Sequence, residues 1–347
     1  MAWRGKWRWL AGGAALLALL VIGRLSFTSA PPGVHSATRL QMGTLVTISV
    51  WGVADGAAER AMEPAFEEIA RIESLMSRFL ASSPLARLNE APRGRTHPVP
   101  GELAQLMARG VEFGRLSRGA FDIGLGPLSD LWGFSREPPP TAPPSREALQ
   151  NWRSRRSALQ GEQGIEITPE GVNLANDAVG VDPGGIAKGY AVDQAMEKLR
   201  QAGVENALIN AGGDMRIAGS KGGKPWHIGL RDPRNPDGVV AVMDLVGPKA
   251  LSTSGDYERF FLADGVRHHH ILDPRSGESA RSGLISVSIQ APDSLTADAL
   301  STALFVLGEQ AGLALLRLFP GCEAFLIRED LSFVQTEGFI AVRSKAP

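Results

Sequence analysis

The segment LTADALSTALFVLG, residues 295–308, opens with oxygen-bearing side chains and ends in apolar ones, as expected of a buried helix. Asp298 and Thr302 are four positions apart and share one helix face, with Ser301 beside them. A carboxylate with hydroxyls is a hard-oxygen set that suits Mg²⁺. Alternatively, these residues only begin the helix, with Thr296 as its N-cap and Asp298 where negative charge is favoured. That alternative does not explain Thr302, which lies past the first turn.

A second candidate site is VDPGGIAKGY, residues 181–190, where two glycines lead into an expected helix with Lys188 in its first turn. The free N–H groups and positive dipole of a helix N-terminus suit a phosphate, and Lys188 would add charge. The spacing matches neither a Walker loop nor a dinucleotide fingerprint. In the alternative, Asp182 caps the helix and the glycines make a turn. The spacing leaves both interpretations open.

Two polar segments separate expected strands further along the chain. NAGGDMRIAG, residues 210–219, favours a tight turn. Ser252, Thr253 and Ser254 precede Gly255 and form either a small polar loop for a ribose or phosphate, or an ordinary strand entry.

Three consecutive histidines, His268 to His270, fall on an expected strand before the turn at Asp273. Neighbours on a strand face opposite sides, so they cannot converge on one ion, and we do not expect zinc. A single inward histidine beside a turn is a candidate general base.

The elements that position these residues follow from periodicity and turn signals. We expect helices over residues 57–79, 101–117 and about 145–155, and one that ends at Gly203. Expected strands cover residues 41–51, 165–167, 172–174, 207–210, 215–218, 227–230, 239–245, 257–262, 267–272 and 284–290. Interspersed helices and hairpins predict an α+β fold of mostly antiparallel sheets with packed helices.

Composition sets limits on function. The 347 residues are 44% hydrophobic, enough for one large core, and a net charge of −1 gives no bias toward nucleic acid, which we exclude as a partner. The single cysteine, Cys322, rules out a disulfide within the chain and is expected in the core.

The first 30 residues have the pattern of a secretory signal: basic residues, an uncharged apolar run over 10–23, then small residues. We expect cleavage; the alternative is an uncleaved anchor that contacts the membrane, since Arg24 follows the apolar run. Both interpretations place residues 31–347 outside the cytoplasm, as one periplasmic domain that is free or anchored in the inner membrane.

Seven motifs, in order, resemble the FAD:protein FMN transferases of the ApbE family. They are MSRF…SPLARLN, GAFDIGLGPLSDLWGF, VDPGGIAKGYAVDQ, INAGGDMRIAG…KPWHIGLRDP, LSTSGDYERFF, HILDPRSG and TADALSTA. The resemblance covers most of the chain, from MGTLVTISV at residue 42 to residue 308. Two positions depart from the family pattern: Pro183 stands where leucine is usual, and Ser276 where threonine is usual. Pro183 removes a backbone N–H from its loop.

The resemblance implies a T-fold-like layered architecture and an Mg²⁺-dependent enzyme that moves FMN from FAD to a Thr or Ser hydroxyl of a target flavoprotein, releasing AMP. It implies His270 as base, Asp298 as a catalytic metal ligand with Thr302 and the backbone at Gly185, and Ser301 as an extra ligand. The implied FAD contacts are Met42, Phe79, Ala120, Phe121, Asp122, Asp182, Lys188 and Leu272.

The expected partner is a flavoprotein subunit of a membrane redox complex. Two alternatives to transfer share the same site. One is a flavin-binding carrier or assembly factor without turnover, and the other is an FAD pyrophosphatase that releases FMN and AMP.

Overall fold

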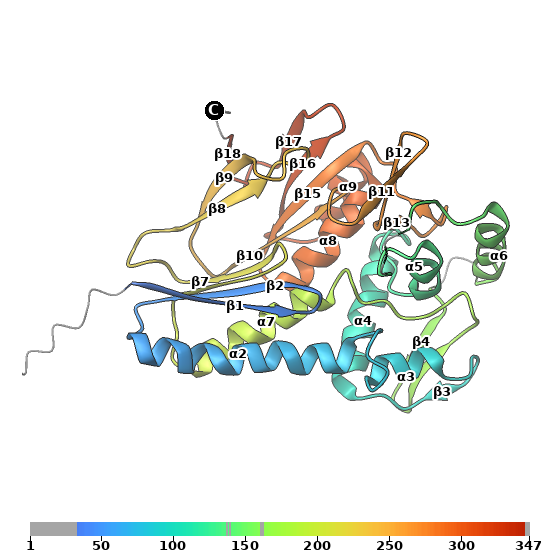
Figure 1. Cartoon of the computed structure of the whole chain (residues 1–347), viewed down its shortest axis with the longest axis horizontal. Coiled ribbons are helices and arrows are strands. Elements are labelled where there is room, and N and C mark those ends of the chain that lie inside the picture. The colour runs from blue at the N-terminus through green and yellow to red at the C-terminus, as the bar shows by residue number, and fades with distance from the viewer. Residues whose placement is uncertain (1–32, 137, 139, 160–162, 344–347) are drawn as a thin grey trace, which may run out of the picture.

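The computed structural model describes residues 33–136, 138, 140–159 and 163–343 (Figure 1). The expected signal or anchor in residues 1–30 lies outside this part of the chain. Among the described residues, no helix combines the length and the apolar character needed to cross a membrane.

The centre of the molecule is an eight-stranded sheet in the order β1-β2-β6-β7-β10-β15-β16-β17, with every neighbouring pair antiparallel. The strands are β1 (Val34–Gln41), β2 (Thr44–Trp51), β6 (Ala207–Ala211), β7 (Asp214–Ala218), β10 (Lys249–Gly255), β15 (Leu284–Ala291), β16 (Glu323–Arg328) and β17 (Phe333–Gln335). Every residue of β15 is buried, as expected of a central strand covered on both faces. The predicted α+β class is confirmed.

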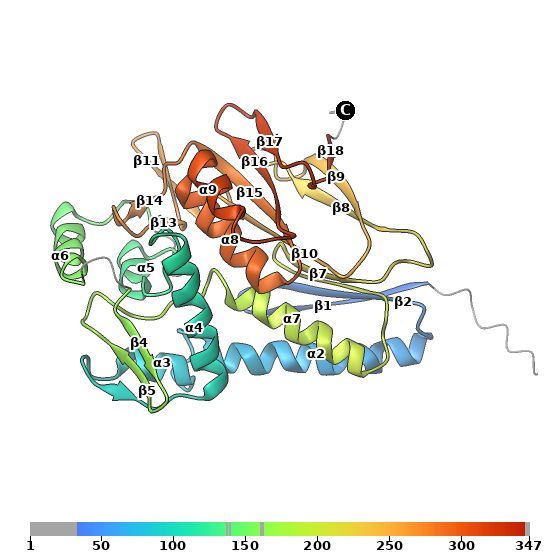
Figure 2. The same ribbon diagram turned by 180° about the vertical axis from the view of Figure 1, so that it is seen from behind.

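Four helices cover one face of this sheet (Figure 2). They are α2 (Asp55–Met76), α7 (Ala187–Gln201), α8 (Ser294–Leu307) and α9 (Glu309–Leu316). Helix α7 packs on both α2 and α8, and α8 lies against β10 and β15. This packing brings the start of α7 close to the start of α8.

The opposite face is covered by a small sheet of order β18-β9-β8. Its strands are β8 (Trp226–Arg231), β9 (Val239–Leu245) and β18 (Val342–Arg343). Along β8, Trp226, Ile228 and Leu230 are buried and alternate with exposed residues, which is the pattern of a strand with one solvated face.

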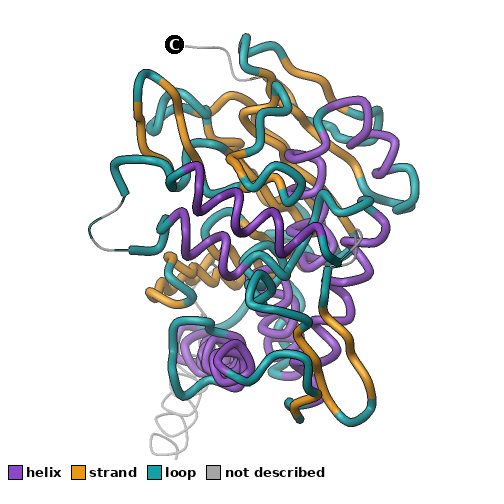
Figure 3. The backbone as a smooth tube through the Cα atoms, turned by 90° about the vertical axis from the view of Figure 1, so that its right-hand side faces the viewer, coloured by secondary structure: helices purple, strands orange, loops and turns teal. Residues whose placement is uncertain are grey.

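The other half of the molecule carries the remaining helices and several short strands, and it faces the viewer in Figure 3. Its helices are α3 (Pro84–Glu90), α4 (Gly101–Leu116), α5 (Gly126–Trp132) and α6 (Arg146–Ser157). Its strands are β3 (Thr96–His97), β4 (Ile165–Thr168) and β5 (Gly171–Leu174), with the hairpins β11 (Phe260–Ala263)–β12 (Val266–His269) and β13 (Leu272–Asp273)–β14 (Glu278–Ser279).

Several expected boundaries are wrong. The strand expected over residues 257–262 begins at Phe260, and the one expected over 267–272 ends at His269. The strand expected over residues 41–51 is the second arm of a hairpin whose turn is Met42 and Gly43, both with positive φ. The helix expected to reach Phe79 ends at Met76, because the Ser77 hydroxyl accepts hydrogen bonds from the backbone N–H groups of Phe79 and Leu80 at 3.2 Å each. Such side-chain acceptors compete with helical hydrogen bonds.

Candidate functional site

Helix α8 is capped by Asp293, not by Thr296. The helix begins at Ser294, and the Asp293 carboxylate accepts a hydrogen bond of 2.8 Å from the Thr296 backbone N–H. An aspartate at the N-cap reaches the third helical N–H in this way. The prediction that Thr296 is the cap is therefore wrong.

A second carboxylate, Asp193 on α7, satisfies the next free N–H groups of α8. It accepts hydrogen bonds of 3.0 Å from both Ser294 and Leu295. The start of α8 is thus complete without Asp298, which lies further along the helix and is 3% exposed. Helix initiation does not account for Asp298.

Helices α7 and α8 cross in close contact at Gly189. A Cβ on this residue would stand 2.3 Å from the Ser294 carbonyl oxygen, so only glycine fits. The Gly189 backbone N–H donates to Asp298 Oδ2 at 3.1 Å, although 109 residues separate them in sequence. The contact places Lys188, in the first turn of α7, beside Asp298.

The Lys188 ammonium lies between two buried carboxylates. Its Nζ is 2.6 Å from Asp214 Oδ2 and 3.6 Å from Asp298 Oδ2. Burial disfavours the charged lysine, but the two negative charges outweigh this effect and raise its pKa. Burial, followed by repulsion from Asp214, raises the pKa of Asp298 to about 7.

Asp214 is a site residue that the sequence did not single out. The expected turn is present, with positive φ at Gly212 and Gly213, and the Asn210 side chain accepts the Gly213 N–H at 2.9 Å. The turn delivers Asp214, 3% exposed, to the start of β7 against Lys188. An acidic residue directly after a glycine pair at a strand end was the available signal.

Four hydroxyls join β10 to α8. Ser254 Oγ lies 2.7 Å from Ser301 Oγ and 3.2 Å from Thr302 Oγ1, and Ser252 Oγ donates to Asp214. Ser252 and Ser254 are two apart on a strand and therefore face the same side. The segment is thus a strand and not a loop, and its serines continue the polar surface that begins at Asp298.

The loop before α7 brings a backbone segment to this polar surface. A Cβ on Gly185 would lie 3.4 Å from Thr302 Oγ1, so the glycine sits next to that hydroxyl. Asn89 fixes the loop, because its side chain accepts from the Val181 N–H at 2.7 Å and donates to the Val181 carbonyl at 2.8 Å.

Asp182 does not cap α7. The N-cap position is Ile186, and the Asp182 carboxylate accepts from the Gly184 N–H at 3.1 Å within the loop. The capping alternative is therefore wrong, and the first turn of α7 has no side-chain cap. Arg78 faces Asp182 at 3.7 Å.

The residues brought together fit a magnesium ion. Asp298, Ser301 and Thr302 form one wall, and Gly185 lies opposite Thr302. The Lys188 ammonium lies between two carboxylates, so the charges of this cluster stabilise a cation. No group of three or more His, Cys, Asp or Glu side chains in the described residues is placed to hold a metal, so an ion here depends on hydroxyl and carbonyl oxygens. Mg²⁺, which keeps several waters, suits such a set.

Three predicted site residues, Met42, Phe79 and His270, are exposed or half-buried, and we refer to them as the rim. Phe79 is 63% exposed, and the Arg78 guanidinium lies 4.9 Å from its ring centre. Met42 is half-buried in the β1–β2 turn, and His270 is exposed after β12. The rim offers apolar surface and one titratable ring.

The three histidines face different surroundings. His269 is 5% exposed and its Nε2 lies 3.0 Å from the Ala280 carbonyl oxygen; burial lowers its pKa to about 4. His268 stacks on Phe261 with ring centres 5.1 Å apart. The pKa of His270 is lowered by the surrounding protein and by nearby positive charges, although one side of the residue meets solvent.

The remaining predicted FAD contacts have buried side chains. Ala120, Phe121 and Leu272 lie in the core, and the Asp122 carboxylate pairs with Arg156. Phe121 reaches the site, since its ring is 3.0 Å from where a Cβ on Gly185 would stand. The side chain of Asp122 serves its ion pair, and an FAD contact at residues 120–122 stays a prediction.

Two surface recesses lie away from this cluster. One is lined by residues that include Arg200, Gly203 and Pro248, and the other by residues that include Tyr190 and Arg216. Neither contains a residue of the buried cluster or of the rim. The site is therefore assigned from its chemistry and not from the size of a recess.

Comparison with known proteins adds an independent finding. The ApbE family model matches residues 42–326. An FAD:protein FMN transferase of Treponema pallidum is 35% identical over 319 residues, covering 88% of both chains. One of Haemophilus influenzae is 34% identical over 305 residues, covering 84% of this chain and 86% of its own.

Solved structures agree with the sequence relatives. The ApbE protein of Thermotoga maritima superposes with a TM-score of 0.77 at 36% identity, covering 88% of this chain and 98% of its own. The flavinyl transferase ApbE of Pseudomonas stutzeri does so with a TM-score of 0.74 at 31% identity, covering 89% and 97%.

Proposed function

The chain belongs to the ApbE family and is a transferase, and we propose that it moves FMN from FAD to a Thr or Ser hydroxyl of a target flavoprotein, with Mg²⁺ bound and AMP released. The observation that carries this proposal is the buried cluster of Lys188, Asp214 and Asp298 with its hydroxyl wall. A purely structural cluster would not need two carboxylates, a lysine and an uncapped helix N-terminus at one point.

Binding of FAD divides between the two parts of the site. The pyrophosphate would lie at the start of α7, where free N–H groups and Lys188 stabilise negative charge. The isoalloxazine ring would lie against Met42 and Phe79, whose exposed apolar surface suits a flat ring. In this arrangement the bond to be broken lies between the buried cluster and the rim.

Asp298, Ser301, Thr302 and the backbone at Gly185 would hold Mg²⁺. When bound, the ion would neutralise the pyrophosphate and polarise the phosphorus. The protein's own contribution is to hold these oxygens in place before the substrate arrives: Gly189 fixes Asp298, and Ser254 fixes Ser301 and Thr302.

His270 would act as the general base. The hydroxyl oxygen of the target forms a bond to the FMN phosphorus, the bond from that phosphorus to the AMP phosphate breaks, and the hydroxyl proton passes to the imidazole. The lowered pKa keeps His270 neutral at pH 7, which is the protonation state that a general base has before the reaction. Its exposure allows a protein hydroxyl to approach it.

We also propose that the enzyme acts outside the cytoplasm, on a flavoprotein subunit of a membrane redox complex. The support is the signal-like pattern of the first 30 residues.

The test incubates the full chain with FAD, Mg²⁺ and a candidate flavoprotein domain, with a known transferase in parallel. Mass spectrometry of the target should show one added FMN, and chromatography should show an equal amount of AMP. Chelation of the metal should stop both. The Asp298→Asn variant, in which transfer should be strongly reduced, serves as the control.

Other outcomes separate the alternatives. A target left unlabelled where the known transferase labels it would contradict transfer. Free FMN and AMP without labelling would instead identify an FAD pyrophosphatase. Bound FAD that stays intact would identify a carrier.

A further inference from the structure

Arg259 is an exposed arginine whose guanidinium has no hydrogen-bond or ion-pair partner among the described residues. Three arginines close to it in the chain have such a partner. Arg234 pairs with Asp256 through two hydrogen bonds of 2.7 and 2.8 Å, Arg231 lies 3.6 Å from Glu258, and Arg267 Nε lies 3.8 Å from Asp256 Oδ2. Arg259 therefore differs from them in being free to bind a ligand.

The backbone places Arg259 next to the proposed base. In the β11–β12 ladder Phe260 opposes His269, and one step further the His270 N–H donates to the Arg259 carbonyl at 3.0 Å. Residues that oppose each other in an antiparallel pair point to the same side. The side chains of Arg259 and His270 therefore share a face.

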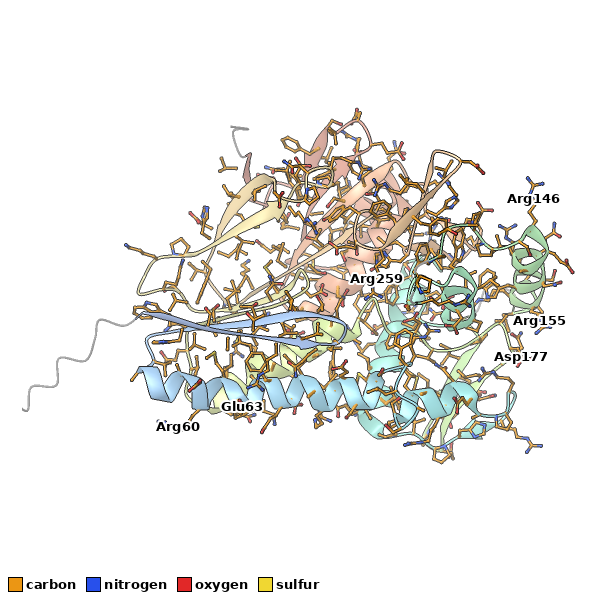
Figure 4. The ribbon with its side chains drawn as sticks, in the orientation of Figure 1. Arg60, Glu63, Arg146, Arg155, Asp177 and Arg259 are labelled. Carbon is orange, nitrogen blue, oxygen red and sulfur yellow. The ribbon has the colours of Figure 1, made fainter. Side chains whose placement is uncertain are left out.

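The guanidinium also lies over the β1–β2 turn, which carries Met42, one of the two proposed contacts of the isoalloxazine ring. Arg259 Nη2 is 3.6 Å from the position that a Cβ on Gly43 would take, and Gly43 follows Met42 in the β1–β2 turn. Figure 4 shows Arg259 near the centre of the molecule, where the β1–β2 hairpin meets the other half. Arg259 thus lies between Met42 and His270.

Positive charge from two directions converges here. Arg259 and Lys188 both act electrostatically on His270, so each of them lies within electrostatic range of its ring. A guanidinium presents several donors that match the oxygens of a phosphate, and an exposed one without a protein partner is available to bind an anion. The flavin nucleotide carries such an anion.

We infer that Arg259 binds the phosphoryl group of the FMN half of FAD, the group that is transferred, beside His270. The inference rests on the proposed function and adds to it a residue outside the predicted FAD contacts. Lys188 and the start of α7 then hold one side of the pyrophosphate, and Arg259 holds the side nearer the flavin.

The test compares two ligands that differ only in the phosphate. Affinities of the full chain for FMN and for riboflavin are measured by flavin fluorescence, without Mg²⁺ or target, in the wild type, Arg259→Gln and Arg259→Lys. Arg259→Gln should weaken FMN binding about 10- to 100-fold and leave riboflavin unchanged, because a charge-assisted hydrogen bond is lost. Arg259→Lys should recover part of the FMN affinity. Arg231→Gln is the matched control and should change neither.

Three results would overturn the inference. These are equal weakening of FMN and riboflavin, no change in either affinity, or a loss seen only in transfer to the target, which would assign Arg259 to protein docking. The same experiments distinguish failure of the proposed function from failure of this inference. If the wild type transfers no FMN while Arg259→Gln still loses FMN selectively, the phosphate contact stands and the transferase proposal falls.

Discussion

The buried cluster and the exposed rim are built in opposite ways. In the cluster, every polar group has protein partners: Asp298 meets Gly189 and Lys188, and Ser301 meets Ser254. On the rim, Phe79 is 63% exposed and His270 is exposed after β12. The cluster is held in position before any ligand binds, whereas the rim is free to be shaped by one.

This difference indicates that function and stability are coupled in the cluster but not on the rim. Preorganised polar groups keep their catalytic geometry at low cost at the moment of reaction. They are also buried, so each must stay paired or destabilise the fold. Changes in the cluster should affect both activity and the protein's own electrostatics, and changes on the rim should affect ligand binding alone.

The largest effect is expected at Asp298. Asp298→Asn keeps an oxygen for the Gly189 N–H but removes the charge, so transfer should fall about 100- to 1,000-fold. The free energy of unfolding should change by about 1 kcal/mol or less, because the pKa of about 7 shows that the charged form is disfavoured by burial. Transfer assays and urea unfolding measure the two effects.

The control for Asp298 is the true cap of the same helix. Asp293→Ala should lower the free energy of unfolding by about 1 kcal/mol and leave transfer unchanged. Equal activity in the two variants would show that the cluster and the cap have the same, structural role.

The next effect concerns acid stability and separates two adjacent histidines. The pKa of His269 falls from 6.5 to about 4 on folding, so above pH 6.5 it is neutral in both states and contributes nothing. As the pH falls from 6.5 to 4, the unfolded state takes up the proton, and about 3 kcal/mol of stability is lost. Urea unfolding at pH 7, 5.5 and 4 measures this loss.

Variants at the two histidines sharpen the contrast. His269→Gln should flatten the pH dependence of stability between pH 6.5 and 4. His270→Gln should remove part of it as well, because the pKa of His270 is also lowered, but less than His269→Gln does, since solvent reaches His270. If the free energy of unfolding stays steeply dependent on pH in His269→Gln but not in His270→Gln, the assignment of His269 as the buried histidine and His270 as the exposed one would be wrong.

A smaller effect is expected at Asp214, which positions Lys188. Asp214→Asn should lower transfer about 10- to 100-fold, as loss of an orienting partner does in comparable sites. It should also lower the pKa of Lys188, which then reacts faster with acetic anhydride at pH 9, as peptide mass spectrometry would record. Lys198 serves as the internal reference. An unchanged rate at Lys188 would contradict the positioning role.

The smallest effect on stability is expected at the rim. Phe79→Ala should change the free energy of unfolding by less than about 0.5 kcal/mol, because the ring is 63% exposed, yet weaken FAD binding about tenfold. Phe66→Ala, at a ring 1% exposed, is the contrasting control and should cost about 3–5 kcal/mol. Unaltered FAD affinity in Phe79→Ala would remove this residue from the proposed contacts of the isoalloxazine ring.

Much of the fold was predictable because its signals are local. Helical spacing predicted α4 at residues 101–117, and the structure has it at Gly101–Leu116. The expected helix after Lys188 and most strands are also present. The errors arose where a single side chain competes with the backbone, as Ser77 does at the end of α2.

The site was predictable only in part. The sequence singled out Asp298, Ser301, Thr302, Lys188 and Gly185, and the structure brings them together. It gave no means of choosing Asp214 over other turn residues, or of recognising Asp293 as the cap. Both assignments depend on which atoms face each other after folding.

By itself, the amino-acid sequence determined the residue types, their order and their local periodicity, and hence the family resemblance and the α+β class. Only the tertiary structure decided that Lys188 stands between Asp214 and Asp298 and that β10 turns its serines toward α8. The reason is physical: periodicity acts over a few residues, whereas the Gly189–Asp298 contact spans 109 residues and exists because α7 and α8 cross so closely at residue 189 that only glycine fits there.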